Sequence, residues 1–212
     1  MPEFWESAFQ DKQTMWGMAP ADTAVAAAVF FGEQSVRNVL IPGFGYGRNA
    51  RPFLDRSMTV TGIEISETAI RLAEEHFGAD LRIHHGPVGQ MPFDRETYDG
   101  VFCFSLLHLL DEAAREKFIA DCYRQLRPGG YMIFVTLSTG DAAYGRGDRL
   151  GEHYFESPHG VRLYFYDEET IVNDFLDYGL IEADEVDDPK ESQDGRPSRR
   201  FWWVVCQKEE VE

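Results

Sequence analysis

Three glycines and one acidic residue form the most informative chemical pattern in this chain. Gly43, Gly45 and Gly47 fall in the segment VLIPGFGYGRNA, where an apolar strand-like run passes into a helix-like segment. Glycines at such a turn let a ligand approach the backbone closely, because no Cβ atom intervenes. Glu64 follows about 20 residues later, at the end of the next strand-like run, a spacing at which a carboxylate reaches ribose hydroxyls. The pattern predicts a site for an adenosine-containing ligand; the alternative is a tight turn and an exposed carboxylate that bind nothing.

The spacing of the glycines bears on which ligand would bind. A pyrophosphate-binding fingerprint has the form G-x-G-x-x-G, and its third glycine would fall on Arg48. The chain has G-x-G-x-G instead. A nicotinamide-dependent oxidoreductase is therefore disfavoured, although it stays as an alternative.

His108 is the first candidate for acid–base catalysis. It follows the strand-like run 98–104 in the segment FSLLHLL. An imidazole with an ordinary pKa can remove a proton from an oxygen or nitrogen nucleophile near neutral pH. The alternative is a structural histidine at the start of a helix.

Strand and helix patterns alternate along the chain and would position these residues. Ser66, Asp111 and Asp167 are expected to begin helices that fill the gaps between strands. The alternation predicts an α/β fold: a Rossmann-like, doubly wound, seven-stranded sheet, mostly parallel, with an antiparallel C-terminal hairpin. The apolar, strand-like runs are 36–41, 58–65, 81–85, 98–104, 131–137, 180–186 and 201–208.

The order of four motifs resembles the class I S-adenosylmethionine-dependent methyltransferases, in particular small-molecule branches of the thiopurine and tellurite-resistance types. VLIPGFGYGRNA is similar to their glycine-rich first motif, and VTGIEIS to their acidic second-strand motif. HHGPVGQMPFDRETYDGVFCFSLLHLL and LRPGGYMIFVTLS are similar to the signatures of strands three to five. The resemblance covers 36–138 and implies S-adenosyl-L-methionine as the cofactor.

The resemblance also implies which residues contact that cofactor. Two positions depart from the family pattern: Ile41 stands where an acidic residue often binds the methionine ammonium, and Pro87 where an aspartate often accepts from adenine. Adenine would then contact the Val88 backbone N–H and apolar side chains. The full expected set of cofactor-binding residues is Gly43, Gly45, Gly47, Glu64, Ile65, Pro87, Val88 and Ser105.

Two segments outside the motifs are candidates for covering the substrate. Trp16 lies in an aromatic N-terminal stretch that either grips an apolar substrate or patches the sheet edge. Tyr144 and His153 lie in the glycine-rich, aromatic segment 140–160, which is either a substrate lid or a solvated loop. We therefore expect Trp16, Tyr144 and His153 to contact the substrate.

The overall charge and the cysteines narrow the function further. A net charge of −17 would repel a nucleic acid and favours a small neutral or cationic methyl acceptor. The three cysteines are far apart and form no CxxC pair, so we expect neither a zinc site nor disulfides. An inactive S-adenosylmethionine-binding module is the non-enzymatic alternative. The oligomeric state cannot be predicted.

The organisation expected from these patterns is one methyltransferase domain over residues 1–212. It comprises an N-terminal helical cap (1–35), a cofactor-binding core (36–138), a candidate substrate lid (139–166), and a C-terminal helix and hairpin (167–212). The start of the chain does not resemble a signal peptide, and its longest early apolar patch is too short to cross a bilayer. We expect a cytoplasmic protein that does not associate with membranes.

Overall fold

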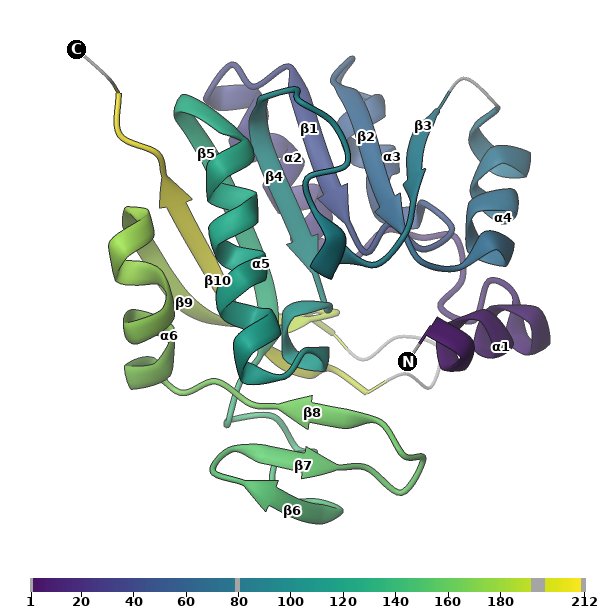
Figure 1. Ribbon diagram of the computed structural model, residues 1–212, viewed down its shortest axis with the longest axis vertical. Coiled ribbons are helices and arrows are strands. Elements are labelled where there is room, and N and C mark those ends of the chain that lie inside the picture. The colour runs from purple at the N-terminus through teal and green to yellow at the C-terminus, as the bar shows by residue number, and fades with distance from the viewer. Residues whose placement is uncertain (1, 79–80, 192–196, 211–212) are drawn as a thin grey trace.

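A seven-stranded sheet forms the centre of the computed structural model, which describes residues 2–78, 81–191 and 197–210 (Figure 1). Its strand order is β3-β2-β1-β4-β5-β10-β9. Neighbouring strands among the first five pair in parallel, whereas β10 is antiparallel to both β5 and β9. The predicted fold class is confirmed. The strands are β1 (Asn38–Pro42), β2 (Thr59–Glu64), β3 (Arg82–His85), β4 (Tyr98–Phe104), β5 (Leu126–Leu137), β9 (Leu180–Asp188) and β10 (Arg199–Gln207).

Helices cover both faces of this sheet (Figure 1). On one face, α2 (Asp22–Glu33), α3 (Arg51–Leu54) and α4 (Glu67–Phe77) contribute to one apolar core. On the other face, α5 (Glu112–Gln125) and α6 (Glu168–Phe175) contribute to a second. The parallel strands β1, β2, β4 and β5 are therefore mostly buried, which explains their near-continuous apolar runs, whereas the edge strand β3 is partly exposed.

Side-chain caps fix where three of the helices begin. The Ser66 side chain accepts a hydrogen bond from the Ala69 N–H, and the Asp111 side chain accepts one from the Ala114 N–H. Asp167 forms a capping box with Thr170 at the start of α6. Each cap satisfies a backbone donor that the helix leaves unpaired. All three starts lie where the sequence predicted them.

The segment after β5 is not the irregular solvated loop that was one of the two alternatives for residues 140–160. It folds into a three-stranded antiparallel sheet of β6 (Asp148–Gly151), β7 (Tyr154–Glu156) and β8 (Arg162–Tyr164). Figure 1 shows this small sheet below the main one. Phe155 and Phe165 are buried where it meets the rest of the chain. The strands have only 3 or 4 residues, too few for an alternating pattern to stand out.

The antiparallel direction of β10 matters for the site. Phe201 pairs with Leu137, so β10 begins at the edge of the sheet where β5 ends. Residues at the start of β10 therefore lie near the carboxyl ends of the parallel strands, where α/β folds bind ligands.

Two further findings concern the described residues. None of the helices within them combines the length and apolar character of a membrane span. No group of three or more His, Cys, Asp or Glu side chains within those ranges is placed to hold a metal ion.

Candidate active site

A cavity of about 800 Å³ opens at the carboxyl ends of the parallel strands. This volume lies within the range of small-molecule and cofactor sites. The structure brings most of the predicted site residues together there: Trp16, Gly43, Gly45, Glu64, Ile65, Pro87, Val88, Ser105 and His108 all line the cavity. Gly47, Tyr144 and His153 do not line it.

Gly45 and Gly47, which follow β1, have different structural roles. Gly45 has a φ of +56°, and a Cβ atom there would meet only Phe9 Cζ, at 3.9 Å. The cavity side of the turn at Gly45 is therefore open to a ligand. Gly47 has a φ of +83°, and a Cβ atom there would lie 2.9 Å from the rings of both Phe44 and Phe77. Gly47 thus serves packing behind the turn, whereas the sequence predicted that it contacts the cofactor.

Glu64 ends β2 and is 6% exposed. Its Oε2 accepts from the Gly45 N–H at 2.6 Å, and its Oε1 accepts from the N–H groups of Ile65 and Ser66 at 2.8 and 2.9 Å. Burial raises the pKa of Glu64, and these three donors oppose that rise. Because a carboxylate has about four acceptor positions, about one position on Oε2 is left for a ligand hydroxyl.

The N-terminal helix α1 (Pro2–Lys12) is tied to the start of α4. Glu6 accepts from the hydroxyls of Ser66 and Thr68, both at 2.6 Å. These bonds lower the pKa of Glu6 to about 2. The connection holds α1 beside the residues that follow Glu64.

An aromatic cluster continues from α1 to the glycine turn. The Trp16 ring stacks on Tyr46, with centroids 6.3 Å apart and planes at 17°. The Tyr46 hydroxyl accepts from the Trp16 N–H at 3.1 Å and donates to the Gly17 carbonyl at 2.8 Å. Trp5 and Phe9 pack against Trp16, and all three rings line the cavity. The N-terminal segment therefore forms a wall of the site.

Replacing Glu6 with alanine tests this attachment. We expect faster amide hydrogen exchange throughout α1 and weaker S-adenosylhomocysteine binding, by a few fold, because the wall loosens. In the wild type the attachment should weaken at low pH, since the folded pKa of about 2 lies below the ordinary glutamate pKa of 4.5. Its stabilising effect is complete above pH 4.5 and is lost as the pH falls towards 2. Glu3→Ala, an exposed position on the same helix, is the control; equal effects of the two variants would contradict the role of Glu6.

His108 lies in the short helix η3 (Leu107–Leu109) and is 3% exposed. Its Nδ1 accepts from the Leu137 backbone N–H at 3.2 Å, so Nε2 carries the ring proton. Nε2 lies 3.5 Å from Ser105 Oγ. Burial, with the nearby Arg199 guanidinium, lowers the pKa of His108 to about 3. The ring is therefore neutral at neutral pH and presents a donor towards Ser105, and the catalytic role expected from the sequence stays a prediction.

Titration of His108 distinguishes these roles. The folded pKa of about 3 lies below the ordinary histidine pKa of 6.5, so the His108 imidazole signals should not shift between pH 8 and 5. For the same reason, the stabilising effect of the neutral ring is complete above pH 6.5 and is lost as the pH falls towards 3. His108→Gln should therefore lose less thermal stability between pH 6.5 and 4 than the wild type. An NMR midpoint near 6.5 would restore the general base.

The predicted substrate residues separate in the structure. Trp16 lines the cavity, whereas the Tyr144 hydroxyl lies 2.8 Å from His153 Nδ1. His153 Nε2 in turn lies 3.1 Å from the Asp167 carboxylate at the start of α6. These contacts join the small sheet to α6 and direct both side chains to each other. From the small-sheet segment, Val161 and Leu163 are the residues that reach the cavity wall.

Sequence reasoning missed several residues on the cavity wall. Arg199 and Phe201 come from the start of β10, and Arg48 and Phe104 from the ends of the core motifs. The antiparallel direction expected for the last strand was the signal that could have placed the first pair there. No motif marks them, because they lie beyond the region of family resemblance.

The arrangement fits an adenosine-containing cofactor. Gly45 leaves open space at the turn, and Glu64 retains an acceptor position for a ribose hydroxyl. Val88 begins the 3₁₀ turn η2 (Val88–Gln90), so its N–H has no partner within that turn, and Val88 lines the same cavity. Ile41 is 3% exposed inside β1 and has no charge, so the methionine ammonium would have to bind elsewhere.

Comparisons with known proteins identify a methyltransferase domain in this chain. Residues 40–134 match the family model described as a methyltransferase domain. The chain is 26% identical over 208 residues to the tRNA N(3)-methylcytidine methyltransferase Mettl2 of Drosophila melanogaster, covering 85% of this chain and 62% of the relative. It is 31% identical over 128 residues to a probable S-adenosylmethionine-dependent methyltransferase of Mycolicibacterium smegmatis, covering 60% and 48% respectively. The chain thus spans less than two thirds of these relatives.

Solved structures share the fold at low sequence identity. The Burkholderia thailandensis 1,6-didemethyltoxoflavin-N1-methyltransferase, with its substrate and S-adenosylhomocysteine bound, superposes with a TM-score of 0.72 at 16% identity, covering 99% of this chain and 87% of that one. TehB from Haemophilus influenzae superposes with a TM-score of 0.66 at 19% identity, covering 97% and 67%. The methyltransferase-domain match over residues 40–134 and these structural neighbours support S-adenosylmethionine as the cofactor, and the chain has the fold of the class I S-adenosylmethionine-dependent methyltransferases.

Proposed function

We propose that this chain transfers the methyl group of S-adenosylmethionine to a small molecule bound in the same cavity. The observation that carries the proposal is that the two ends of one cavity have different chemical character. One end has the open turn at Gly45 and the acceptor position of Glu64. The other end has apolar and cationic side chains, among them Phe201, Leu163 and Arg199, which have no counterpart in cofactor recognition.

The chain's own residues would act mainly by alignment and by exclusion of water. S-Adenosylmethionine supplies an activated methyl group on a sulfonium, open to in-line displacement. Glu64 would hold a ribose hydroxyl, and the aromatic cluster around Trp16 would cover that end of the cavity. Positioning of this kind can account for much of the rate enhancement of a bimolecular reaction. With His108 neutral and donating, an acceptor that reacts without a protein base fits the site best.

A small acceptor is supported over a nucleic acid. The relative Mettl2 is named for activity on tRNA, whereas the Burkholderia enzyme is named for a small heterocycle. Nucleic-acid binding gains most of its free energy from basic side chains on phosphates. This chain has 20 Lys and Arg against 37 Asp and Glu. The charge balance and the enclosed cavity both favour the small acceptor.

A screen of acceptors for S-adenosylhomocysteine release tests the proposal. Small molecules with amine, thiol and hydroxyl nucleophiles are incubated with the protein and S-adenosylmethionine, and unmodified tRNA transcripts are included. We expect release with at least one small acceptor and none with tRNA, and loss of release in Glu64→Ala. Release with tRNA alone would contradict the small-molecule proposal. Tight cofactor binding with no release from any acceptor would instead indicate a binding module without catalytic activity.

A further inference from the structure

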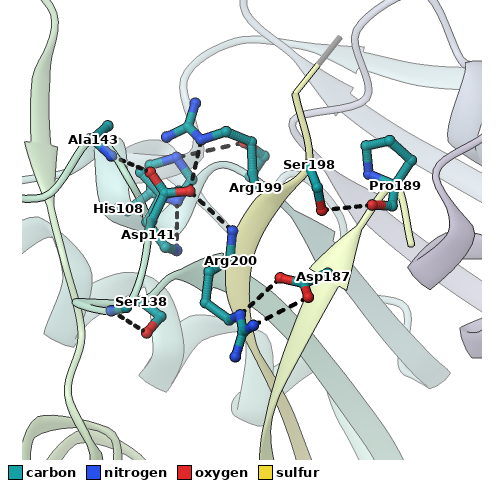
Figure 2. A network of polar contacts seen from close by, with 12 residues as sticks. His108, Ser138, Asp141, Ala143, Asp187, Pro189, Ser198, Arg199 and Arg200 are labelled. Atoms are coloured by element: carbon teal, nitrogen blue, oxygen red, sulfur yellow. Dashed lines mark hydrogen bonds and ion pairs between the residues drawn. The ribbon is translucent and has the colours of Figure 1, made fainter. Parts of the chain in front are cut away.

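Arg199 is held in one orientation at the acceptor end of the cavity. Its Nε donates to Asp141 Oδ2 at 2.8 Å, as Figure 2 shows. The Asp141 side chain is completely buried, and it also accepts from the N–H groups of Ala143 and Arg200 at 2.8 and 2.9 Å. Burial alone would raise the pKa of Asp141, but the bonds from Arg199 and these backbone groups lower it. Asp141 therefore stays charged and fixes the guanidinium.

One nitrogen of this guanidinium has no partner. Arg199 Nη2 is buried and makes no hydrogen bond with any described residue. Among the described residues, Arg115 Nε and Gln125 Oε1 are the other buried side-chain atoms in this condition, and neither residue lines the cavity. A buried donor without an acceptor is unfavourable, and native structures rarely keep one without a reason. Nη2 itself is covered in this structure, but Arg199 lines the cavity and its side chain is 38% exposed, so a bound molecule can contact the guanidinium there.

Donors and partly engaged carboxylates surround Arg199 at this end of the cavity. His108 lies beside Asp141 and Arg199 in Figure 2, with Nε2 as its protonated nitrogen. The nearby wall carboxylates already have partners: Asp188 accepts from the N–H and hydroxyl of Thr23 at 2.8 and 2.6 Å. Asp22 likewise accepts from the Lys190 N–H at 2.8 Å. A ligand here therefore meets the Arg199 guanidinium beside carboxylates that are partly engaged by Thr23 and Lys190.

The rest of this wall is apolar. Phe104 and Phe201 lie with ring centroids 5.7 Å apart, and Leu137 and Leu163 line the same region. Such a surface suits a flat hydrocarbon or aromatic body with one polar group. The planar guanidinium matches two oxygen atoms of one carboxylate better than any other common group does.

We propose that Arg199 is the specificity-determining residue for the methyl acceptor, and that the acceptor is a small, largely apolar molecule bearing a carboxylate. The inference rests on the proposed function, since it assigns the end of the cavity that the cofactor does not use. It differs from the expectation drawn from the net charge of −17, which favoured a neutral or cationic acceptor. The fixed orientation of the Arg199 guanidinium, rather than the charge of the whole chain, is what we expect to select the acceptor.

Benzoate and benzamide form a matched pair of probes, because they share a flat apolar ring and differ in charge. Calorimetry with protein saturated in S-adenosylhomocysteine should show benzoate binding at least tenfold more tightly than benzamide, with one site per chain. Arg199→Gln should bring the two affinities together, and Arg199→Lys should retain part of the preference. Arg200→Gln is the control, because the neighbouring Arg200 side chain pairs with Asp187 and does not line the cavity. It should keep the full preference.

Several outcomes of this experiment would contradict the role proposed for Arg199. Equal binding of the two probes by the wild type, no binding of either, or a preference that survives in Arg199→Gln would overturn the proposal. S-Adenosylhomocysteine affinity is measured in every variant and reports that the site has folded. If Arg199→Gln weakens that affinity instead, the arginine serves the cofactor and the proposal fails. Failure of the wild type itself to bind S-adenosylhomocysteine would contradict the proposed function, which separates the two claims.

Discussion

Glu64→Ala should weaken S-adenosylhomocysteine binding by at least about tenfold while leaving the fold intact. A hydrogen bond to a charged acceptor contributes about 1.5–3 kcal/mol, and the structure leaves about one acceptor position on Glu64 for the ribose. A loss of that size corresponds to roughly 10–150-fold in affinity. The substitution also removes the acceptor for the Gly45 N–H, so the turn itself becomes less well fixed. Both effects act in the same direction.

The control for this variant is Glu67→Ala, which removes a carboxylate three residues further along, whose side chain is 82% exposed. Calorimetry of both variants measures the affinity, and circular dichroism confirms that each is folded. Unchanged affinity in folded Glu64→Ala, or an equal loss in Glu67→Ala, would refute the assigned role.

Alanine at Gly45 and at Gly47 should have different consequences, although both positions have positive φ. A left-handed conformation costs a non-glycine residue about 1–2 kcal/mol. At Gly47 the new methyl group must also displace the rings of Phe44 and Phe77, which adds about 1–3 kcal/mol of overpacking. Gly47→Ala should therefore lower the free energy of unfolding by about 2–5 kcal/mol, a fall in Tm of roughly 4–20 °C.

Gly45→Ala should destabilise the fold less and affect the cofactor more. Its methyl group meets no atom closer than 3.9 Å and enters the open side of the turn. We expect S-adenosylhomocysteine affinity to fall at least about tenfold, or roughly 1.4 kcal/mol. Thermal unfolding and calorimetry on both variants check the contrast. An equal loss of stability in the two variants, with equal affinities, would contradict the different functions assigned to the two glycines.

The main sheet could be predicted because its signals are local. The inner parallel strands are buried on both faces and therefore read as apolar runs, as 131–137 does. Ser66 and Asp111 marked helix starts, since a cap depends on a single side chain near the turn that it satisfies. The antiparallel hairpin followed from the absence of a helix-length crossover before the last strand.

The cofactor end of the cavity could be predicted for a similar reason. The glycine turn and Glu64 lie at the ends of adjacent parallel strands, so their proximity follows from the fold itself. The function of Gly47 could not be predicted, because the obstacle to a side chain there includes Phe77, thirty residues away in sequence. Spacing alone does not distinguish a glycine that faces a ligand from one that faces a ring.

The acceptor end depended on tertiary contacts that no local pattern encodes. Tyr144 and His153 contact each other instead of the cavity, and His153 also contacts Asp167 at the start of α6. Arg199 reaches the cavity only because β10 runs antiparallel and Asp141 holds its guanidinium. The positions of such residues follow from the fold. The net charge of the whole chain therefore does not predict which charged groups line the cavity.

The most direct test of the central claim, that this cavity binds S-adenosylmethionine and not a dinucleotide, is a pair of calorimetric titrations on the wild-type protein. S-Adenosylhomocysteine should bind with one site per chain, and NAD should give no measurable heat of binding under the same conditions. Tight binding of NAD with no response to S-adenosylhomocysteine would contradict the account.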